Sequence, residues 1–271
     1  MRDLRSSEWV VLAYLLYLVV AAVATRLPAA RLRIVLLASA LVATLVVLLA
    51  SLRQTAAIGV IRDWIPGLYV LAGFWLSGLF NQGANEGLEA WLEEIDLALF
   101  RRLQVAGAGG LLRPAVTGLL ELAYLYCYAV VPGGIAVLYI AGHREAANAY
   151  WTPVLAAAYA SYGTLPFFVT RPPRSIEPQG SVLRHVPAIR RLNLALLRHA
   201  SIQVNTLPSG HAAVAFAAAL ALGGPLPAAG AAFGAVALLI SIGAVAGRYH
   251  YAVDVVLGAL VGVVAACAAG G

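Results

Sequence analysis

The chain has 271 residues, of which 62% are hydrophobic and 11% are charged, and its mean hydropathy is +0.87. Soluble domains carry about 25% charged residues, so this composition excludes an ordinary soluble protein and predicts a polytopic membrane protein. The 18 basic residues, all of them arginine, outnumber the 12 acidic ones. Arginine is suited to phosphate because its planar fork stays charged, although a GC-rich coding bias would also remove lysine.

Three apolar runs in the first 80 residues are close to the roughly 20 residues that span a bilayer. They cover residues 9–25, 34–52 and 64–80. The first run follows Arg2 and Arg5 but lacks a small-residue cleavage site behind it, so we expect it to remain as the first span. Cys127 and Cys267 lie inside later apolar runs and are predicted to be packing residues rather than a disulfide or metal set.

Residues 86–104 have a different pattern. Apolar residues recur every three or four positions, which is typical of an amphipathic helix. The acidic residues between them are Glu86, Glu89, Glu93, Glu94 and Asp96. With Asn85 as an N-cap, we expect a helix that lies along the membrane surface with a solvated acidic face. A metal-binding carboxylate cluster is the alternative.

Two further spans follow. Residues 114–142 are long enough to cross with a tilt or with a kink at Pro132. They carry Glu121, Tyr124 and Tyr128 on one face. A carboxylate inside a span is a candidate functional group, and the alternative is a structural hydrogen bond to a tyrosine or arginine of a neighbouring helix. Residues 146–170 form the fifth span, which we expect the prolines at 172 and 173 to end.

Residues 171–207 are the only long polar connection. Their arginines are Arg171, Arg174, Arg184, Arg190, Arg191 and Arg198. A short interfacial helix around residues 189–196 would place an arginine-rich edge near lipid head groups. The candidate contacts for a substrate head group are Arg184 and Arg191 of this connection and Glu121, Tyr124 and Tyr128 of the fourth span. Residues 208–223, 225–246 and 251–269 supply the closing spans. We therefore predict an all-α membrane bundle of about eight spans with interfacial helices, divided into an N-terminal part (1–112) and a catalytic bundle (113–271).

The polar ends of the fifth, sixth and eighth spans fall on the same membrane face. The sixth span opens with the string Asn-Thr-Leu-Pro-Ser-Gly-His at residues 205–211. Pro208 suits the first turn of a helix, and Asn205 or Thr206 can cap it. The amides of residues 209–211 would then point at a ligand before the helix, which is a favourable place for an anion. His211 adds a proton donor.

The eighth span opens with His250 and Asp254, whose spacing of four residues places both on one helical face. A carboxylate that accepts from one imidazole nitrogen leaves the other nitrogen free to attack. Arg171, Arg174 and Arg248 can neutralise the oxygens of a phosphoryl group in transfer. Two histidines on one phosphate predict an in-line displacement.

These elements resemble the type 2 phosphatidic acid phosphatase superfamily, whose signature joins an Arg-Pro element, Pro-Ser-Gly-His and His-x-x-x-Asp. The resemblance covers roughly residues 119–269. It implies that His250 is the nucleophile that becomes a phosphohistidine, that Asp254 supports it and that His211 protonates the leaving oxygen. The phosphate ligands that it implies are Arg171, Ser209 and Gly210. No metal-ligand cluster is evident in the sequence, and the implied mechanism needs no metal or other cofactor.

The sequence departs from that signature at two positions where the superfamily usually carries a cation. Thr164 stands in place of a lysine and Ala244 in place of an arginine. We predict that Arg174 and Arg248 supply the missing charge. The Thr-Arg-Pro-Pro-Arg and Arg-Tyr-His-Tyr strings look more like the branch related to inositol phosphorylceramide synthases, which moves a phosphoalcohol head group between lipids.

Several functions remain open on the sequence. If water attacks the phosphohistidine, the protein is a lipid phosphatase, and if a bound hydroxyl attacks, it is a phosphotransferase. A transporter or flippase for anionic lipids would also explain polar groups in the membrane, but not the His250 and Asp254 pair beside a helix-start anion site. A haloperoxidase, the soluble type of relative, does not fit a chain this apolar.

Membrane orientation does not follow clearly from charge. Of the 18 arginines, 13 fall on the predicted active face, but seven of these belong to the site or its loop, which leaves six against five. With so small a difference the positive-inside rule predicts no orientation. The family resemblance favours an extracytoplasmic site. We expect a multi-pass protein of the cell membrane that acts on a lipid phosphate among membrane lipids and binds no nucleic acid.

Overall fold

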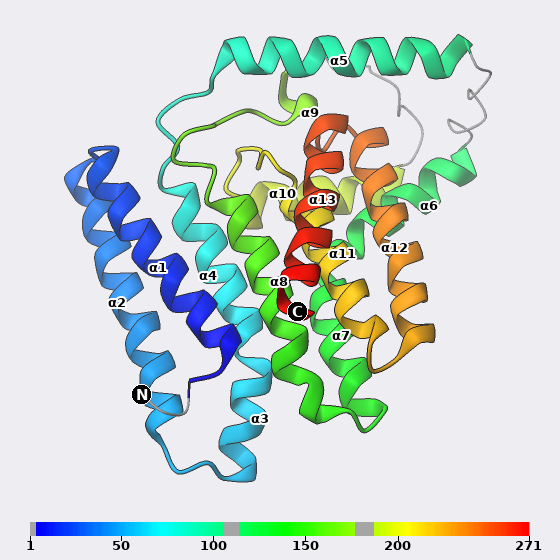
Figure 1. Cartoon of the computed structure of the whole chain (residues 1–271). Coiled ribbons are helices and arrows are strands. Elements are labelled where there is room, and N and C mark those ends of the chain that lie inside the picture. Colours follow the sequence, from blue (N-terminus) through cyan, green and yellow to red (C-terminus); the bar gives the residue numbers. More distant parts are fainter. Residues whose placement is uncertain (1–3, 106–113, 177–186, 271) are drawn as a thin grey trace.

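The computed structural model describes residues 4–105, 114–176 and 187–270, and in these residues the fold is helical with a single isolated β-bridge (Figure 1). In chain order the helices are α1 (Ser6–Ala24), α2 (Ala29–Ser51), α3 (Ala56–Trp64), α4 (Pro66–Gly78), α5 (Glu86–Val105), α6 (Pro114–Leu125), α7 (Cys127–Ile140), the 3₁₀ turn η2 (Arg144–Ala146), α8 (Ala147–Tyr162), α9 (Pro173–Ile176), α10 (Pro187–Ala200), α11 (Gly210–Gly223), α12 (Pro227–Ala246) and α13 (Ala252–Gly270).

Within the described residues, five helical segments are long and apolar enough to cross a membrane: α1, α2, α3 with α4, α12 and α13. The bent pair of α6 and α7 makes a sixth if it counts as one span. Helices α8 and α11 are shorter, with 16 and 14 residues. The predicted all-α multi-pass bundle is confirmed, while the number of eight spans stays a prediction.

The structure corrects one predicted helix boundary and adds a bend inside the fourth predicted span. α8 ends at Tyr162 instead of residue 170, because Gly163 caps it and Pro166, which lacks an amide hydrogen, disfavours helix just beyond. For residues 114–142 a tilt or a kink at Pro132 were the alternatives. Pro132 lies inside α7, and the chain bends by 61° at Tyr126. This bend directs α6 against α10 and α12.

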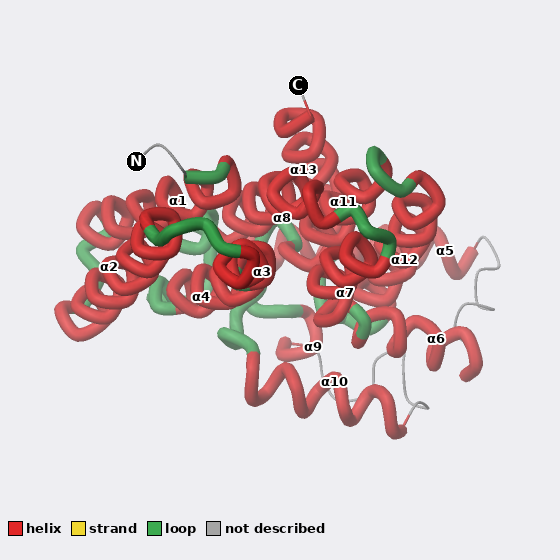
Figure 2. Tube along the Cα trace, turned by 90° about the horizontal axis from the view of Figure 1, so that it is seen from below, coloured by secondary structure: helices red, strands yellow, loops and turns green. Residues whose placement is uncertain are grey.

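α8 lies in the middle of the bundle. Figures 1 and 2 place α1 to α4 on one side of it and α7, α11, α12 and α13 on the other. α11 packs against α8, α12 and α13 with alanines that are fully buried. The amphipathic helix α5 lies across one end of the bundle, and the amphipathic helix α10 lies beside the bundle near that end (Figures 1 and 2). The polar ends of the fifth, sixth and eighth predicted spans therefore lie at this end of the bundle.

Two glycines let α13 approach α11 closely. A Cβ atom on Gly258 would lie 2.4 Å from the Ser209 carbonyl oxygen, and one on Gly262 would lie 2.4 Å from the Ala213 carbonyl oxygen. Small residues four apart are a common means of close helix contact in membranes. This contact fixes the height of the beginning of α13 relative to the beginning of α11.

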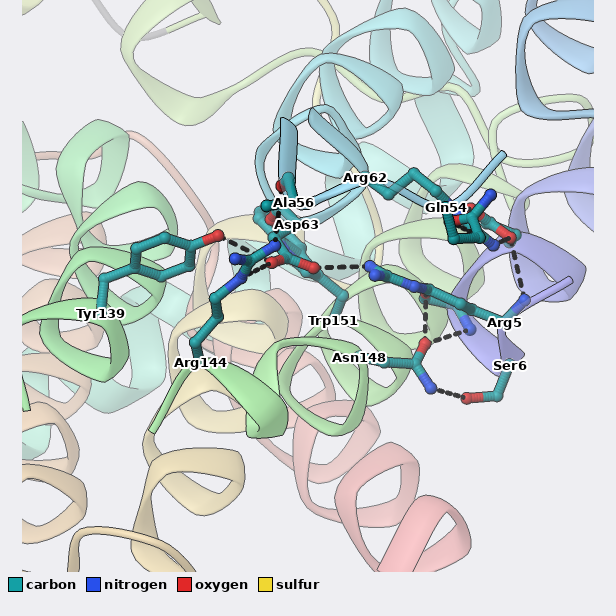
Figure 3. A network of polar contacts seen from close by, with 12 residues as sticks. Arg5, Ser6, Gln54, Ala56, Arg62, Asp63, Tyr139, Arg144, Asn148 and Trp151 are labelled. Carbon is teal, nitrogen blue, oxygen red and sulfur yellow. Dashed lines mark hydrogen bonds and ion pairs between the residues drawn. The ribbon is translucent and has the colours of Figure 1, made fainter. Parts of the chain in front are cut away.

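The opposite end of the bundle is held by a polar network around Asp63 (Figure 3). Its carboxylate accepts from Arg5 Nη1 at 2.7 Å, Tyr139 Oη at 2.7 Å and Arg144 Nε at 2.9 Å. These partners come from the turn before α1, from α7 and from η2, so the N-terminal helices are attached to the rest of the bundle here.

The predicted division between residues 112 and 113 lies outside the described residues.

Gly262→Ala tests the close contact of α13 with α11. Alanine favours a helix by about 1 kcal/mol over glycine, but its Cβ atom would clash with the Ala213 carbonyl. We expect a net destabilisation of about 1–3 kcal/mol. Thermal unfolding in detergent can be followed by a maleimide dye that reacts with the buried thiol of Cys127, in a Cys267→Ser background because Cys267 is exposed.

Val264→Ala is the matched control for this substitution, because Val264 is an exposed residue on the same helix. It should leave the unfolding temperature almost unchanged. A Gly262→Ala protein as stable as the parent would show that α13 and α11 do not pack as closely as described.

Candidate active site

His211 and His250 face each other at the end of the bundle that α5 covers. His211 is the second residue of α11, and His250 lies in the turn that leads into α13. His211 Nδ1 and His250 Nε2 are 3.3 Å apart, and the ring planes meet at 68°. The structure thus brings together two residues that the sequence places on different spans.

Asp254 lies behind His250. Its Oδ2 atom is 3.6 Å from His250 Nδ1, which is longer than a hydrogen bond but close enough for the negative charge to favour a proton on Nδ1. The same oxygen accepts from the Tyr251 amide at 3.0 Å and from Asn205 Nδ2. With the proton on Nδ1, the Nε2 lone pair of His250 points at His211, which then donates from its own Nδ1.

Asn205 is a site residue that sequence reasoning assigned only to capping. Its amide donates to the Thr170 carbonyl at 2.7 Å, and its side chain contacts Thr170 Oγ1 at 3.2 Å as well as Asp254. It joins the chain after α8 to the beginning of α13. The signal in the sequence was its position three residues before the Pro-Ser-Gly-His string. A buried amide side chain requires hydrogen-bond partners, and Asn205 finds them at the site.

The beginning of α11 differs from the prediction. The helix begins at Gly210 rather than Pro208, and the N-cap is Ser209, whose Oγ accepts from the Ala212 amide at 3.4 Å. The Ser209 amide donates to the Asp254 carbonyl at 2.8 Å, and the Gly210 amide donates to Thr206 Oγ1 at 3.1 Å. Two of the three amides expected to cradle phosphate therefore already have protein partners.

Gly210 has a packing reason to be glycine. A Cβ atom there would lie 2.7 Å from the ring carbon Cε1 of Tyr162. The absence of a side chain at Gly210 therefore lets Tyr162 of α8 pack against the beginning of α11.

The three candidate arginines have different surroundings. Arg174 lines a small cavity together with both histidines, donates from Nη1 to the Tyr249 carbonyl at 3.3 Å and lies over the Tyr249 ring. Burial lowers the pKa of the Arg174 guanidinium, but a guanidinium remains charged near neutral pH. Arg171 and Arg248 are directed instead toward α5.

Both of these arginines form ion pairs with α5. Arg171 makes a forked contact with Glu89, with its Nη2 at 2.7 Å and its backbone amide at 2.6 Å. Arg248 donates to Asp96 in a pair that is buried on both sides. The two carboxylates are seven residues apart and hence on one helix face, so the prediction of a solvated acidic face was wrong for Glu89 and Asp96.

Glu121 makes the structural hydrogen bonds to arginine and tyrosine that the sequence analysis gave as the alternative to a functional role. It accepts from Arg190 Nη1 at 2.8 Å, from Asn193 Nδ2 at 2.7 Å and from Tyr249 Oη at 2.6 Å. The Tyr249 ring stacks on Tyr124 with centroids 3.9 Å apart. Glu121 therefore supports Tyr249, the residue next to His250, and a contact of Glu121 with a head group stays a prediction.

The remaining head-group candidates differ in position. Tyr124 and Tyr128 both pack near the His211 ring, with centroids at 5.6 and 6.1 Å. Arg191 is exposed on α10, and Arg184 lies outside the described residues. In the part of the chain that the structure describes, no three His, Cys, Asp or Glu side chains are grouped to hold a metal ion.

A family model described as the PAP2 superfamily matches residues 147–269, somewhat less than half of the chain. This match supports the type 2 phosphatidic acid phosphatase superfamily. It also supports an enzyme of the phosphatase or phosphotransferase type that acts at a membrane, while the inositol phosphorylceramide synthase-like branch stays a prediction. No curated protein and no solved structure matches the chain.

The PAP2 segment contains both histidines, Asp254 and Arg174, but it does not contain all their neighbours. Glu89 and Asp96 of α5 and Glu121 of α6 lie before it in the chain. The carboxylates that neutralise Arg171, Arg248 and Arg190 therefore come from outside the segment that carries the superfamily pattern.

Glu89→Gln tests the tie between α5 and Arg171. Burial would raise the pKa of Glu89, but the hydrogen bonds from Arg171 outweigh it, so the pKa lies below its ordinary value of 4.5. The pair therefore stabilises the fold above pH 4.5, and this contribution is lost as the pH falls through the lower folded-state pKa. At pH 7 we expect the variant to unfold about 2–4 °C lower, for a loss of about 1 kcal/mol.

Because a maleimide reacts too slowly with thiols at low pH, the intrinsic fluorescence of the five tryptophans measures this difference in unfolding temperature across a pH series. The difference in unfolding temperature between variant and parent should disappear below pH 4.5, because protonation of Glu89 removes the ion pair from the parent too. A gap that stays constant down to low pH, or no gap at pH 7, would contradict the tie.

Proposed function

We propose that the protein is an integral membrane lipid phosphatase or phosphotransferase that cleaves a lipid phosphate ester through a phosphohistidine at His250. One observation carries the proposal. Two imidazoles from different helices lie 3.3 Å apart, and a carboxylate lies behind only one of them. The carboxylate distinguishes the two rings, since it favours His250 as the nucleophile and leaves His211 as the proton donor.

The reaction has two displacements. His250 Nε2 attacks phosphorus and the ester P–O bond breaks. His211, protonated as the imidazolium, gives one proton to the departing oxygen and becomes neutral. Water or a hydroxyl group then attacks phosphorus opposite the P–N bond, from the side that the departing oxygen has left. His211 takes the proton of that nucleophile, the P–N bond breaks, and both imidazoles return to their starting states.

Arg174 is the cation that we assign to the phosphoryl group. It lines the cavity beside both histidines, and this cavity of about 30 Å³ is also lined by Tyr124, Tyr249 and Asn205. A half-buried guanidinium there would offset the negative charge of the phosphoryl oxygens. Arg171 and Arg248 could join Ser209 and Gly210 as phosphate ligands only by exchanging their α5 carboxylates for phosphate oxygens.

A second cavity supports a lipid substrate. It has a volume of about 420 Å³ and is lined mainly by apolar side chains of α4 and α7, including Leu68, Leu71, Trp75 and Val131. The two cavities share five lining residues, which are Phe74, Leu197, Ser201, Thr206 and His211. A phosphate at the histidines would thus have an apolar groove of ligand-binding size beside it, which suits an acyl chain.

A transporter of anionic lipids has less support. The buried charged residues of the described part form two groups, one around Asp63 and one around the two histidines. The core between them contains tyrosine hydroxyls that bond to backbone carbonyls, such as those of Tyr14 and Tyr159, but no buried charged residue of the described part. The extracytoplasmic placement of the site and its location in the cell membrane stay predictions.

Purified protein in detergent or liposomes should release labelled phosphate from a diacyl lipid phosphate, and much less from water-soluble glycerol phosphate. His250→Ala should lower kcat by at least about 1,000-fold, and His211→Ala by roughly 100- to 10,000-fold. Product analysis with and without an added lipid alcohol separates the two acceptors, since a transferase forms a new phospholipid and a phosphatase forms only inorganic phosphate.

His199→Ala is the control, because His199 is an exposed histidine of α10. It should keep the parent activity. Full activity in a folded His250→Ala protein would refute the proposal, and so would equal rates on the diacyl and water-soluble substrates for the lipid part of it.

A further inference from the structure

The turn that carries His250 is held on both flanks by one carboxylate of α5. Asp96 Oδ2 accepts from Arg248 Nη1, two residues before His250. Asp96 Oδ1 accepts from the backbone amide of Ala252, two residues after it, at 2.9 Å. A single side chain from outside the PAP2 segment thus fixes both ends of a five-residue turn.

The backbone of this turn has an unusual residue at the position that Arg248 occupies. Arg248 follows the C-cap of α12 and has a φ of +59°, in the left-handed region where glycine is the usual choice. A side chain there carries a steric cost, so its contacts must compensate. The guanidinium reaches Asp96 and lies over the Phe100 ring of α5, 5.1 Å from its centroid.

The ion pair between Asp96 and Arg248 is buried. The side chain of Asp96 is fully buried and that of Arg248 is 4% exposed. Removing one partner of a buried ion pair is strongly destabilising, because the remaining charge stays buried and loses that partner. The Ala252 amide is the first of α13, where the helix dipole also favours a carboxylate.

A second carboxylate holds the middle of the turn from the other side. Asp254 accepts from the Tyr251 amide and from Asn205, and its charge faces His250 Nδ1. The His250 and Tyr249 amides both donate to the Ala244 carbonyl, at 3.1 and 2.9 Å. The position of the His250 ring therefore depends on α12, α13 and α5 together.

We infer that Asp96 is a positioning residue for the phosphoryl transfer proposed above, so that α5 is part of the active site rather than only a helix on the membrane surface. Asp96 acts through the turn and does not touch the reacting atoms. This inference rests on the proposed function, and it requires that loss of the Asp96 carboxylate misplaces the His250 ring relative to His211 while substrate binding is retained.

Asp96→Asn in the full chain is the main test. Because small misplacement of a reacting group is costly, we expect kcat on the diacyl lipid phosphate to fall at least about 10-fold, with KM within about threefold of the parent. Glu94→Gln is the matched control, since Glu94 is an exposed carboxylate on the same helix. It should leave kcat, KM and the unfolding temperature unchanged.

A readout that does not need activity separates this inference from the proposed function. Diethyl pyrocarbonate modifies accessible histidines, and mass spectrometry reports each one. His250 is buried in the parent, so Asp96→Asn should raise its modification rate at least about threefold, with the exposed His199 as internal reference. If the parent cleaves no lipid phosphate, the proposed function fails, but this measurement still decides whether Asp96 holds the turn.

Ala252→Pro covers the case in which Asp96→Asn does not fold. Proline is tolerated in the first turn of a helix, and it removes only the amide that donates to Asp96. We expect a folded protein in which kcat falls and His250 labelling rises in the same direction. Parent-like kcat and parent-like labelling in a folded Asp96→Asn protein, or in folded Ala252→Pro when the former does not fold, would overturn the inference.

Discussion

The contact between His211 and His250 requires two helices to begin at the same height in the bundle. α11 and α13 are separate in the chain, and each supplies one ring near its first turn. Gly258 and Gly262 allow the two helices to approach so closely that added methyl groups would strike the α11 carbonyls. The Ser209 amide and the Asp254 carbonyl then join the two helix beginnings directly. Helix packing, rather than a flexible loop, thus sets the distance between the imidazoles.

Charge balance is the second constraint at this end of the molecule. Arg171, Arg248 and Arg190 are paired with Glu89, Asp96 and Glu121 in turn, whereas Arg174 pairs with no carboxylate among the described residues. Buried charges require such partners because desolvation is costly. The arginine that faces the histidines is therefore the one whose charge is still available to an anion. This division of roles explains how a site with several arginines can offer a defined position for one phosphoryl group.

Local sequence patterns were sufficient for the helix bundle and for the two catalytic candidates, but not for their partners. Apolar runs predict spans because the bilayer requires internally bonded backbone, and the four-residue spacing of His250 and Asp254 predicts a shared face. The carboxylates of α5 lie 82 residues before Arg171 and 152 before Arg248, and no local pattern encodes such pairing. The end of α8 was predictable, since Pro166 marks it, but the later prolines at 172 and 173 were given that role. The bend at Tyr126 has no local marker and follows from the packing of α6.

Capture of the covalent intermediate tests the central claim most directly. The protein would be mixed with a lipid phosphate labelled at phosphorus, quenched within milliseconds to seconds, and digested for peptide mapping under alkaline conditions that preserve phosphohistidine. The two-imidazole geometry predicts an acid-labile label on the peptide that contains His250, which decays as product forms. Label on His211 instead, or steady product formation with no labelled protein at any time point, would contradict the account.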